Sequence, residues 1–166
     1  DHCLWTCVQK TGATIDMMEA NGRCEGVDGR THMRFLYIED WYGNGWQFRD
    51  GVNINEWQHY YCGKRSSYAD KKYDGDYYPV AHKAPQENGY VKKFGYDREH
   101  PETEVAEEVG AASTTYFCDY YYQAEGGEVV ISGGAVAYGA NVGPCSRSCD
   151  NFAAASYWGI VGRPRH

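Results

Sequence analysis

The chain has 166 residues, a formal net charge of −7 and a hydrophobic fraction of 42%. Its length and apolar content suit one packed domain, which we expect to span residues 1–166. Leu4 and Leu36 are the only leucines, against 16 tyrosines and 20 glycines. A helical bundle needs leucine at its core positions, whereas tyrosine and glycine favour sheets and tight turns, so the composition predicts a β-rich fold.

Charge and hydropathy exclude some partners. The acidic balance argues against a general nucleic-acid binder. The chain also has no apolar run of about 18 residues, so we expect neither a nucleic acid nor a membrane as partner. Residues 64–98 differ from the rest because they hold eight basic and five acidic residues, a local charge of +3.

The first half of the chain predicts one short helix and three strands. Thr14 precedes an apolar run that Asn21-Gly22 ends, which is typical of a capped helix over residues 14–20. β-Branched and aromatic residues then predict strands at Met33–Glu39, Trp46–Arg49 and Trp57–Cys62. Asn44-Gly45 favours a hairpin turn between the first two strands.

The second half combines a long irregular segment with further helices and strands. Gly63–Arg98 contains prolines and turn pairs, and Asn88-Gly89 indicates one more hairpin there. Later signals predict a helix at Pro101–Ala112, strands at Thr114–Gln123 and Glu128–Tyr138, a helical stretch at Cys145–Tyr157 and a last edge strand at Tyr157–Val161. The fold class we expect is α+β, an antiparallel sheet of about four or more strands with short helices packed on it.

The seven cysteines are dispersed along the chain without a CxxC pair, which argues against a zinc site. We expect a secreted chain from which a signal peptide has been removed, since it begins at Asp1. Three disulfides and one free thiol are then expected among the cysteines, whose pairing stays open: Cys3, Cys7, Cys24, Cys62, Cys118, Cys145 and Cys149.

One enzyme-like pattern is a ribonuclease hypothesis. Glu56-Trp57 looks like the catalytic-strand step of microbial guanyl-specific ribonucleases, whose chemistry needs a carboxylate or histidine base, a histidine acid and an arginine. The histidines available for it are His32, His59, His82 and His100. A toxin or lectin that stacks tyrosines on sugars is a further alternative. No motif for a catalytic serine, a zinc protease or a phosphate-binding loop occurs.

Four residues carry a resemblance to a known family. Trp46-Gln47-Phe48-Arg49 is similar to the Trp-Arg-aromatic-basic motif of the LARS group of secreted fungal avirulence proteins, with Gln47 in place of arginine. The resemblance implies an antiparallel sheet with helices packed on it and a structural role for the motif. We interpret Trp46 and Phe48 as inward-facing and Arg49 as paired or at the surface.

The resemblance also implies a non-enzymatic effector without catalytic residues, metal or cofactor. Such a protein acts as a monomer in the apoplast or after uptake by host cells, where it binds a host protein or immune receptor and modulates plant immunity. We expect Gly63–Arg98 to carry the partner-facing surface, since long loops are often functional and tyrosine binds at small entropic cost. Its candidate residues are Lys71, Lys72, Tyr77, Tyr78, Lys92 and Lys93.

Overall fold

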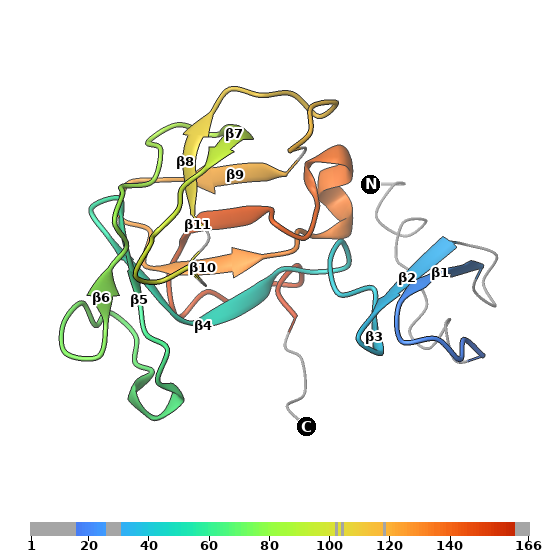
Figure 1. Cartoon of the computed structure of the whole chain (residues 1–166), viewed down its shortest axis with the longest axis horizontal. Coiled ribbons are helices and arrows are strands. Elements are labelled where there is room, and N and C mark those ends of the chain that lie inside the picture. Colours follow the sequence, from blue (N-terminus) through green and yellow to red (C-terminus); the bar gives the residue numbers. More distant parts are fainter. Residues whose placement is uncertain (1–15, 26–30, 102, 104, 118, 162–166) are drawn as a thin grey trace.

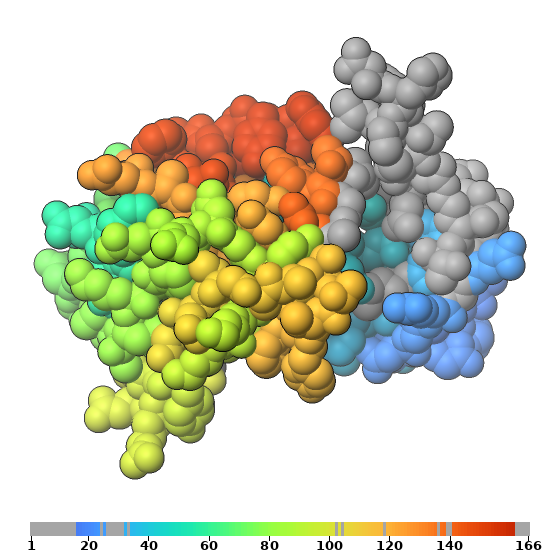
Figure 2. Space-filling view, turned by 90° about the horizontal axis from the view of Figure 1, so that it is seen from above, coloured from blue at the N-terminus to red at the C-terminus, as the bar shows by residue number. Residues whose placement is uncertain are grey.

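The computed structural model describes residues 16–25, 31–101, 103, 105–117 and 119–161, which form two sheets. A three-stranded sheet comprises β1 (Gly22–Glu25), β2 (Thr31–Phe35) and β3 (Ile38–Glu39). An eight-stranded sheet has the order β6-β5-β4-β10-β11-β9-β7-β8. The small sheet lies at one end of the molecule, beside the curled large sheet (Figure 1, Figure 2).

The large sheet is antiparallel except between β11 and β9, which run parallel. Its strands are β4 (Gln47–Asn55), β5 (Gln58–Tyr61), β6 (Tyr78–Pro79), β7 (Gly89–Phe94), β8 (Ala106–Val109), β9 (Tyr120–Gln123), β10 (Val129–Ser132) and β11 (Arg147–Asn151). Helical structure in the described residues is confined to two 3₁₀ segments, η1 (Arg65–Ser67) and η2 (Val136–Asn141). None of these described helices is long and apolar enough to cross a bilayer.

Each face of the large sheet has its own apolar core. One cluster gathers residues from most strands of the sheet, including Ile54, Val91, Tyr121 and Val130. The other cluster is smaller and consists of Trp46, Ile131 and Ala135. Because Val130 and Ile131 are neighbours in β10 and point to opposite faces, this strand contributes to both cores.

The helices of the expected α+β fold are wrong for the described residues. Pro101–Ala112 is largely irregular and contains β8, which pairs with β7. Lys92 and Lys93 form ion pairs with Glu108 and Glu107 across these strands, at 3.0 and 2.7 Å between nitrogen and carboxylate oxygen. Strand pairing therefore outweighs the local helix signal of this segment.

Two other expected helices are also wrong. Cys145–Tyr157 contains β11, which lies between β10 and β9 and buries its first three residues. Its alanines follow the strand in a turn region rather than continuing a helix. Residues 16–20 of the expected first helix form turns and bends, and residues 14 and 15 lie outside the described residues.

The turns also differ from the expected pattern. Asn44-Gly45 lies in the connection between the two sheets and does not join a hairpin. The hairpin instead forms inside the expected strand Met33–Glu39, where Leu36 and Tyr37 adopt φ values of 48° and 64°. Asn88-Gly89 makes no hairpin turn, because Gly89 begins β7. The expected strand at Tyr157–Val161 is reduced to a bridge between Ile160 and Trp46.

The expected disulfide framework is also wrong. Cys62 and Cys149 are buried free thiols, so at most five of the seven cysteines remain for pairing and three bridges cannot form. No disulfide joins two cysteines of the described residues. Cys3, Cys7 and Cys118 lie outside them.

We expect Trp46→Ala to lower the free energy of unfolding by about 3–5 kcal/mol, since it leaves a large cavity. Trp46 is 1% exposed and contacts the rings of Tyr122 and Tyr138 edge-on. Phe48→Ala is the matched control and should cost less than about 1 kcal/mol, because Phe48 is 40% exposed, contrary to the expected inward position. Urea denaturation measures both, and equal losses would contradict this assignment.

We expect Cys149 to resist alkylation in the folded protein. Burial raises the pKa of its thiol to about 12, so little thiolate exists at neutral pH. Native protein treated with iodoacetamide should carry no label on the Cys62 and Cys149 peptides, whereas protein unfolded in guanidinium should carry label on both. Equal labelling of Cys149 in the two states would show that the thiol is accessible.

Candidate functional site

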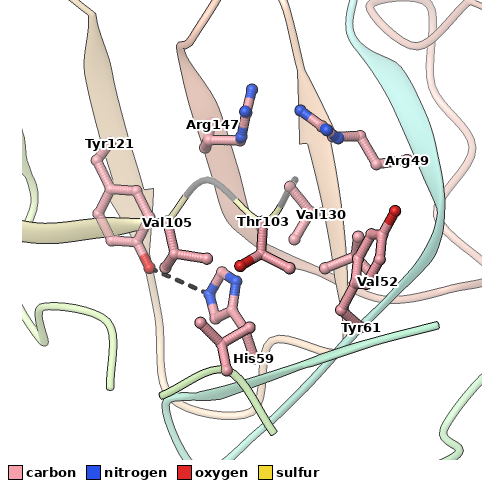
Figure 3. A pocket seen from close by; sticks show the side chains of 10 residues that line it. Arg49, Val52, His59, Tyr61, Thr103, Val105, Tyr121, Val130 and Arg147 are labelled. Carbon is pink, nitrogen blue, oxygen red and sulfur yellow. Dashed lines mark hydrogen bonds between the residues drawn. The ribbon is translucent and has the colours of Figure 1, made fainter. Parts of the chain in front are cut away.

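A small pocket opens on the face of the large sheet that carries the larger core. Four adjacent strands supply part of its wall, with Arg49 from β4, Val130 from β10, Arg147 from β11 and Tyr121 from β9. Figure 3 shows the two guanidinium groups on one side of this pocket, with the His59 ring on the opposite side. Its free volume of about 20 Å³ admits roughly one water-sized atom group.

His59 forms the floor of the pocket. It lies on β5 opposite Ile54 and is 3% exposed. Burial and, to a smaller extent, the positive charge of Arg147 together lower the pKa of the His59 imidazole to about 3. His59 is therefore neutral at physiological pH, which leaves the guanidinium groups as the positive charges of the pocket.

A tyrosine orients the His59 ring. The Tyr121 hydroxyl lies 3.5 Å from Nε2 of His59 and donates a hydrogen bond to Oε1 of Gln123 at 2.7 Å. Burial raises the pKa of the Tyr121 phenol far above its ordinary value, so the hydroxyl keeps its proton. The phenol is thus a fixed polar group rather than an acid that exchanges protons at neutral pH.

Thr103 is positioned beside His59 by the loop between β7 and β8. Its hydroxyl donates to the His100 carbonyl oxygen at 2.8 Å. The Asp97 carboxylate holds the same loop by accepting backbone hydrogen bonds from Ala81, Glu99 and His100. Thr103 thereby lines one side of the pocket (Figure 3).

A larger groove adjoins this pocket through two shared residues, Arg49 and Val52. Arg49 lines both, and the groove has a volume of about 430 Å³, the size of a ligand site. Its walls combine the exposed ring of Phe48 with residues of the segment Gly63–Arg98, namely Arg65, Tyr68, Ala69, Asp70 and Tyr77. Arg49 thus lies where a two-arginine pocket meets an open groove.

The arrangement suits an anionic group. Guanidinium groups recognise carboxylates and phosphates through paired N–H donors. Four of the other eight residues that line the small pocket are valines, and an apolar surrounding strengthens the attraction between opposite charges. Because the free volume admits about one water-sized group, one oxygen of the anion would enter while the rest of the ligand stays in the groove.

The ribonuclease constellation is not assembled in the described structure. Glu56 lies in the turn between β4 and β5 and lines a different cavity from His59. His32 belongs to the small sheet, whereas His82 contacts the Val105 carbonyl oxygen and His100 stacks on Tyr78. Of the four candidate histidines, His59 alone lines the two-arginine pocket.

The proposed partner-facing residues do not form a free basic surface. Lys71 pairs with Glu128 at 2.6 Å and Lys72 with Asp74 at 3.6 Å, and the Lys92 and Lys93 pairs bind glutamates of β8. Tyr77 is 3% exposed and its hydroxyl bonds to the Ala69 backbone, which corrects its assignment to the surface. Carboxylates therefore balance the positive charge of these four lysines. Two of the carboxylates, Glu107 and Glu108, belong to β8, and a third, Glu128, directly precedes β10.

Four tyrosines on one face of the large sheet contact one another, which bears on the alternative of a sugar-binding surface. Rings of Tyr90, Tyr120, Tyr122 and Tyr138 form a continuous set of edge and tilted contacts. The hydroxyls of Tyr90 and Tyr122 bond to the Asn141 side chain. These contacts give the tyrosines a packing role on the face that also buries Trp46.

Arg147, Thr103 and Tyr121 are site residues that the sequence did not indicate. Arg147 lies in a stretch whose alanines predicted a helix, and Thr103 follows a proline that predicted another. The sequence indicated Arg49 only as the last residue of the Trp46–Arg49 motif and not as a residue of a pocket. Comparison with known proteins adds no relative: no family model, curated protein or solved structure matches the chain.

We expect His59 to make the protein less stable as the pH falls. Its pKa is about 3 in the folded protein and about 6.5 in the unfolded chain, so between these limits the unfolded chain binds the proton. The contribution is therefore complete above pH 6.5 and declines by about 1.4 kcal/mol for each pH unit below it. Urea denaturation between pH 6.5 and 4.5 measures this slope.

His59→Gln should flatten that slope, and His82→Gln should change it far less, because His82 is the smallest of the three causes of the lowered pKa. Where the His59 variant fails to fold, NMR of the wild-type imidazole provides the answer, since its resonances should not titrate above pH 4. An ordinary titration near pH 6.5 would contradict the buried neutral histidine.

Proposed function

We propose that this protein is a secreted, non-enzymatic effector that acts by binding a host component and modulating plant immunity. The observation that carries the binding role is the convergence of Arg49 and Arg147 at the mouth of a groove. The role in plant immunity draws on the Trp46–Arg49 resemblance and the cysteine content. The helices that the same resemblance implied do not occur in the described residues, so the binding role is argued from the two arginines and not from that family.

The partner that this site suits presents an anionic group on a short exposed segment. The groove accommodates the segment, Arg49 meets the anion at the rim and Arg147 meets it inside. Arg49 is exposed and Arg147 is 5% exposed, which matches these two positions. Carboxylate and phosphate share the chemistry that two guanidinium groups recognise.

Binding fits this site better than phosphodiester cleavage. Cleavage needs a base and an acid within reach of the same substrate. The lining of the two-arginine pocket contains His59 but not Glu56, and the Tyr121 hydroxyl stays protonated. The groups that meet there hold an anion in place without a matched proton donor and acceptor.

We expect phosphate and acetate to perturb the NMR signals of the Arg49, Arg147 and His59 side chains in the purified protein. A bound anion favours protonated imidazole, so it should also raise the pKa of His59. Arg147→Gln should abolish the perturbation. Arg98→Gln is the matched control, because Arg98 is exposed and lines neither cavity, and it should leave the anion response unchanged.

Substitutions of Arg49 and of the control residue Arg98 test the biological role. Arg49→Gln should lose suppression of plant immune responses while keeping its melting temperature, and Arg98→Gln should keep both. Incubation with total RNA examines the alternative activity. If the protein cleaves RNA and His59→Gln abolishes this cleavage, the protein is a ribonuclease and the binding proposal is wrong. If Arg49→Gln suppresses plant immune responses as fully as wild type, the site has no part in that function.

A further inference from the structure

The small sheet has an inverted distribution of polar and apolar side chains. His32 on β2 is 1% exposed, and Asp40, directly after β3, is also buried. The apolar residues of the β2–β3 turn lie outside, with Leu36 and Tyr37 61% and 71% exposed. Buried polar groups are costly unless they are paired, and His32 and Asp40 bond to each other, so the centre of this sheet is polar rather than apolar.

Three side chains with metal-binding atoms meet at this centre. The pairing of Arg34 with Glu39 and of Phe35 with Ile38 brings the end of β3 next to β2. As a result, ligand atoms of His32, Glu39 and Asp40 all lie within 4.8 Å of one another. Nδ1 of His32 is 2.6 Å from Oδ2 of Asp40.

We propose that His32, Glu39 and Asp40 form a binding site for a divalent transition-metal ion of the zinc class. One imidazole nitrogen and two carboxylate oxygens are ligands that Zn²⁺ accepts, with water completing a tetrahedral site. Two carboxylates and a neutral imidazole carry a charge of −2, which a divalent cation neutralises. The mixed nitrogen and oxygen donors favour zinc over calcium or magnesium, which prefer oxygen ligands alone.

The geometry requires only a small adjustment to hold the ion. Metal–ligand distances near 2.0–2.2 Å place neighbouring ligand atoms roughly 3.2–3.6 Å apart in a tetrahedral site. Nδ1 of His32 and Oδ2 of Asp40 are 2.6 Å apart, so they must separate by roughly 0.6–1.0 Å to reach this spacing, and the other ligand atoms already lie within 4.8 Å. Asp40 has a φ of 42°, a conformation that aspartate tolerates better than most residues, and it follows a two-residue strand that restrains its partner Glu39 little.

A bound ion would stabilise the small sheet in the way that an apolar core stabilises a larger sheet. The two hydrophobic clusters of the described residues belong to the large sheet and its flanks and include no residue of β1, β2 or β3. Metal ligation is a common substitute for a core in very small units. Binding energy of this kind appears as folding energy, so the metal should stabilise this part of the chain.

Arg34 is the competing partner for these carboxylates. It lies opposite Glu39 and donates from Nη1 to the Met17 carbonyl oxygen at 2.5 Å. If arginine alone balances the acidic pair, the site has no use for a cation. Metal titration separates these two cases directly.

The test is isothermal titration calorimetry of the full chain, stripped of metal with EDTA, with Zn²⁺, Mn²⁺, Ca²⁺ and Mg²⁺. We expect Zn²⁺ to bind at this site with one ion per chain, to raise the melting temperature and to bind more tightly than Ca²⁺ or Mg²⁺. Co²⁺ replacing Zn²⁺ should give the visible absorption of a four-coordinate ion. Failure of Zn²⁺ to bind would overturn the proposal.

Variants assign the binding to these residues. Glu39→Gln is the decisive one, because Glu39 is only partly buried and glutamine keeps its shape. It should weaken Zn²⁺ binding by about tenfold or more, and the metal-free melting temperature of the same variant is the reference for its stabilisation by Zn²⁺. Asp40→Asn and His32→Ala should weaken it further, whereas Glu107→Gln, a control in the large sheet, should bind as wild type. Zn²⁺ affinity that Glu39→Gln and Asp40→Asn leave intact would place the ion on other ligands, such as the cysteines, and overturn the proposal.

Discussion

The fold depends on the central position of β10, whose two faces are buried in different cores. Val130 and Ile131 are 2% and 0% exposed, and their neighbours on either side are β4 and β11. This strand therefore fixes the distance between the two strands that carry Arg49 and Arg147. The guanidinium groups converge because one apolar strand, buried on both sides, separates them.

Burial also decides the chemistry of the pocket. His59, Tyr121 and Cys149 lie in the same core, and burial shifts the pKa of each toward its uncharged form. The arginines keep their charge because guanidinium does not deprotonate in proteins. At neutral pH the histidine, tyrosine and cysteine are uncharged, and the two arginines keep their positive charge. This combination suits the binding of an anion.

The sequence predicted where strands form better than it predicted which strands pair with one another. Residues of β5, β9 and β10 lie in expected strands, because β-branched and aromatic residues mark them directly. The helix over Pro101–Ala112 failed because Val105 and Val109 fit a helical face and β8 about equally well, and pairing with β7 decided between them. Arg147 could not be foreseen as a site residue, since its neighbours Tyr121 and His59 are distant in sequence and only the strand order brings them together.

Strand order has a consequence for how the chain is made. β4 ends at Asn55, yet one of its two neighbours is β10, which begins at Val129, and Trp46 pairs with Ile160. During synthesis, one edge of β4 stays uncovered until β10 has left the ribosome, and Trp46 stays unpaired until Ile160 has followed. Exposed strand edges and apolar faces promote aggregation, and non-local pairing slows folding. Nascent chains that stall before β10 should therefore need a chaperone, while complete chains close the sheet themselves.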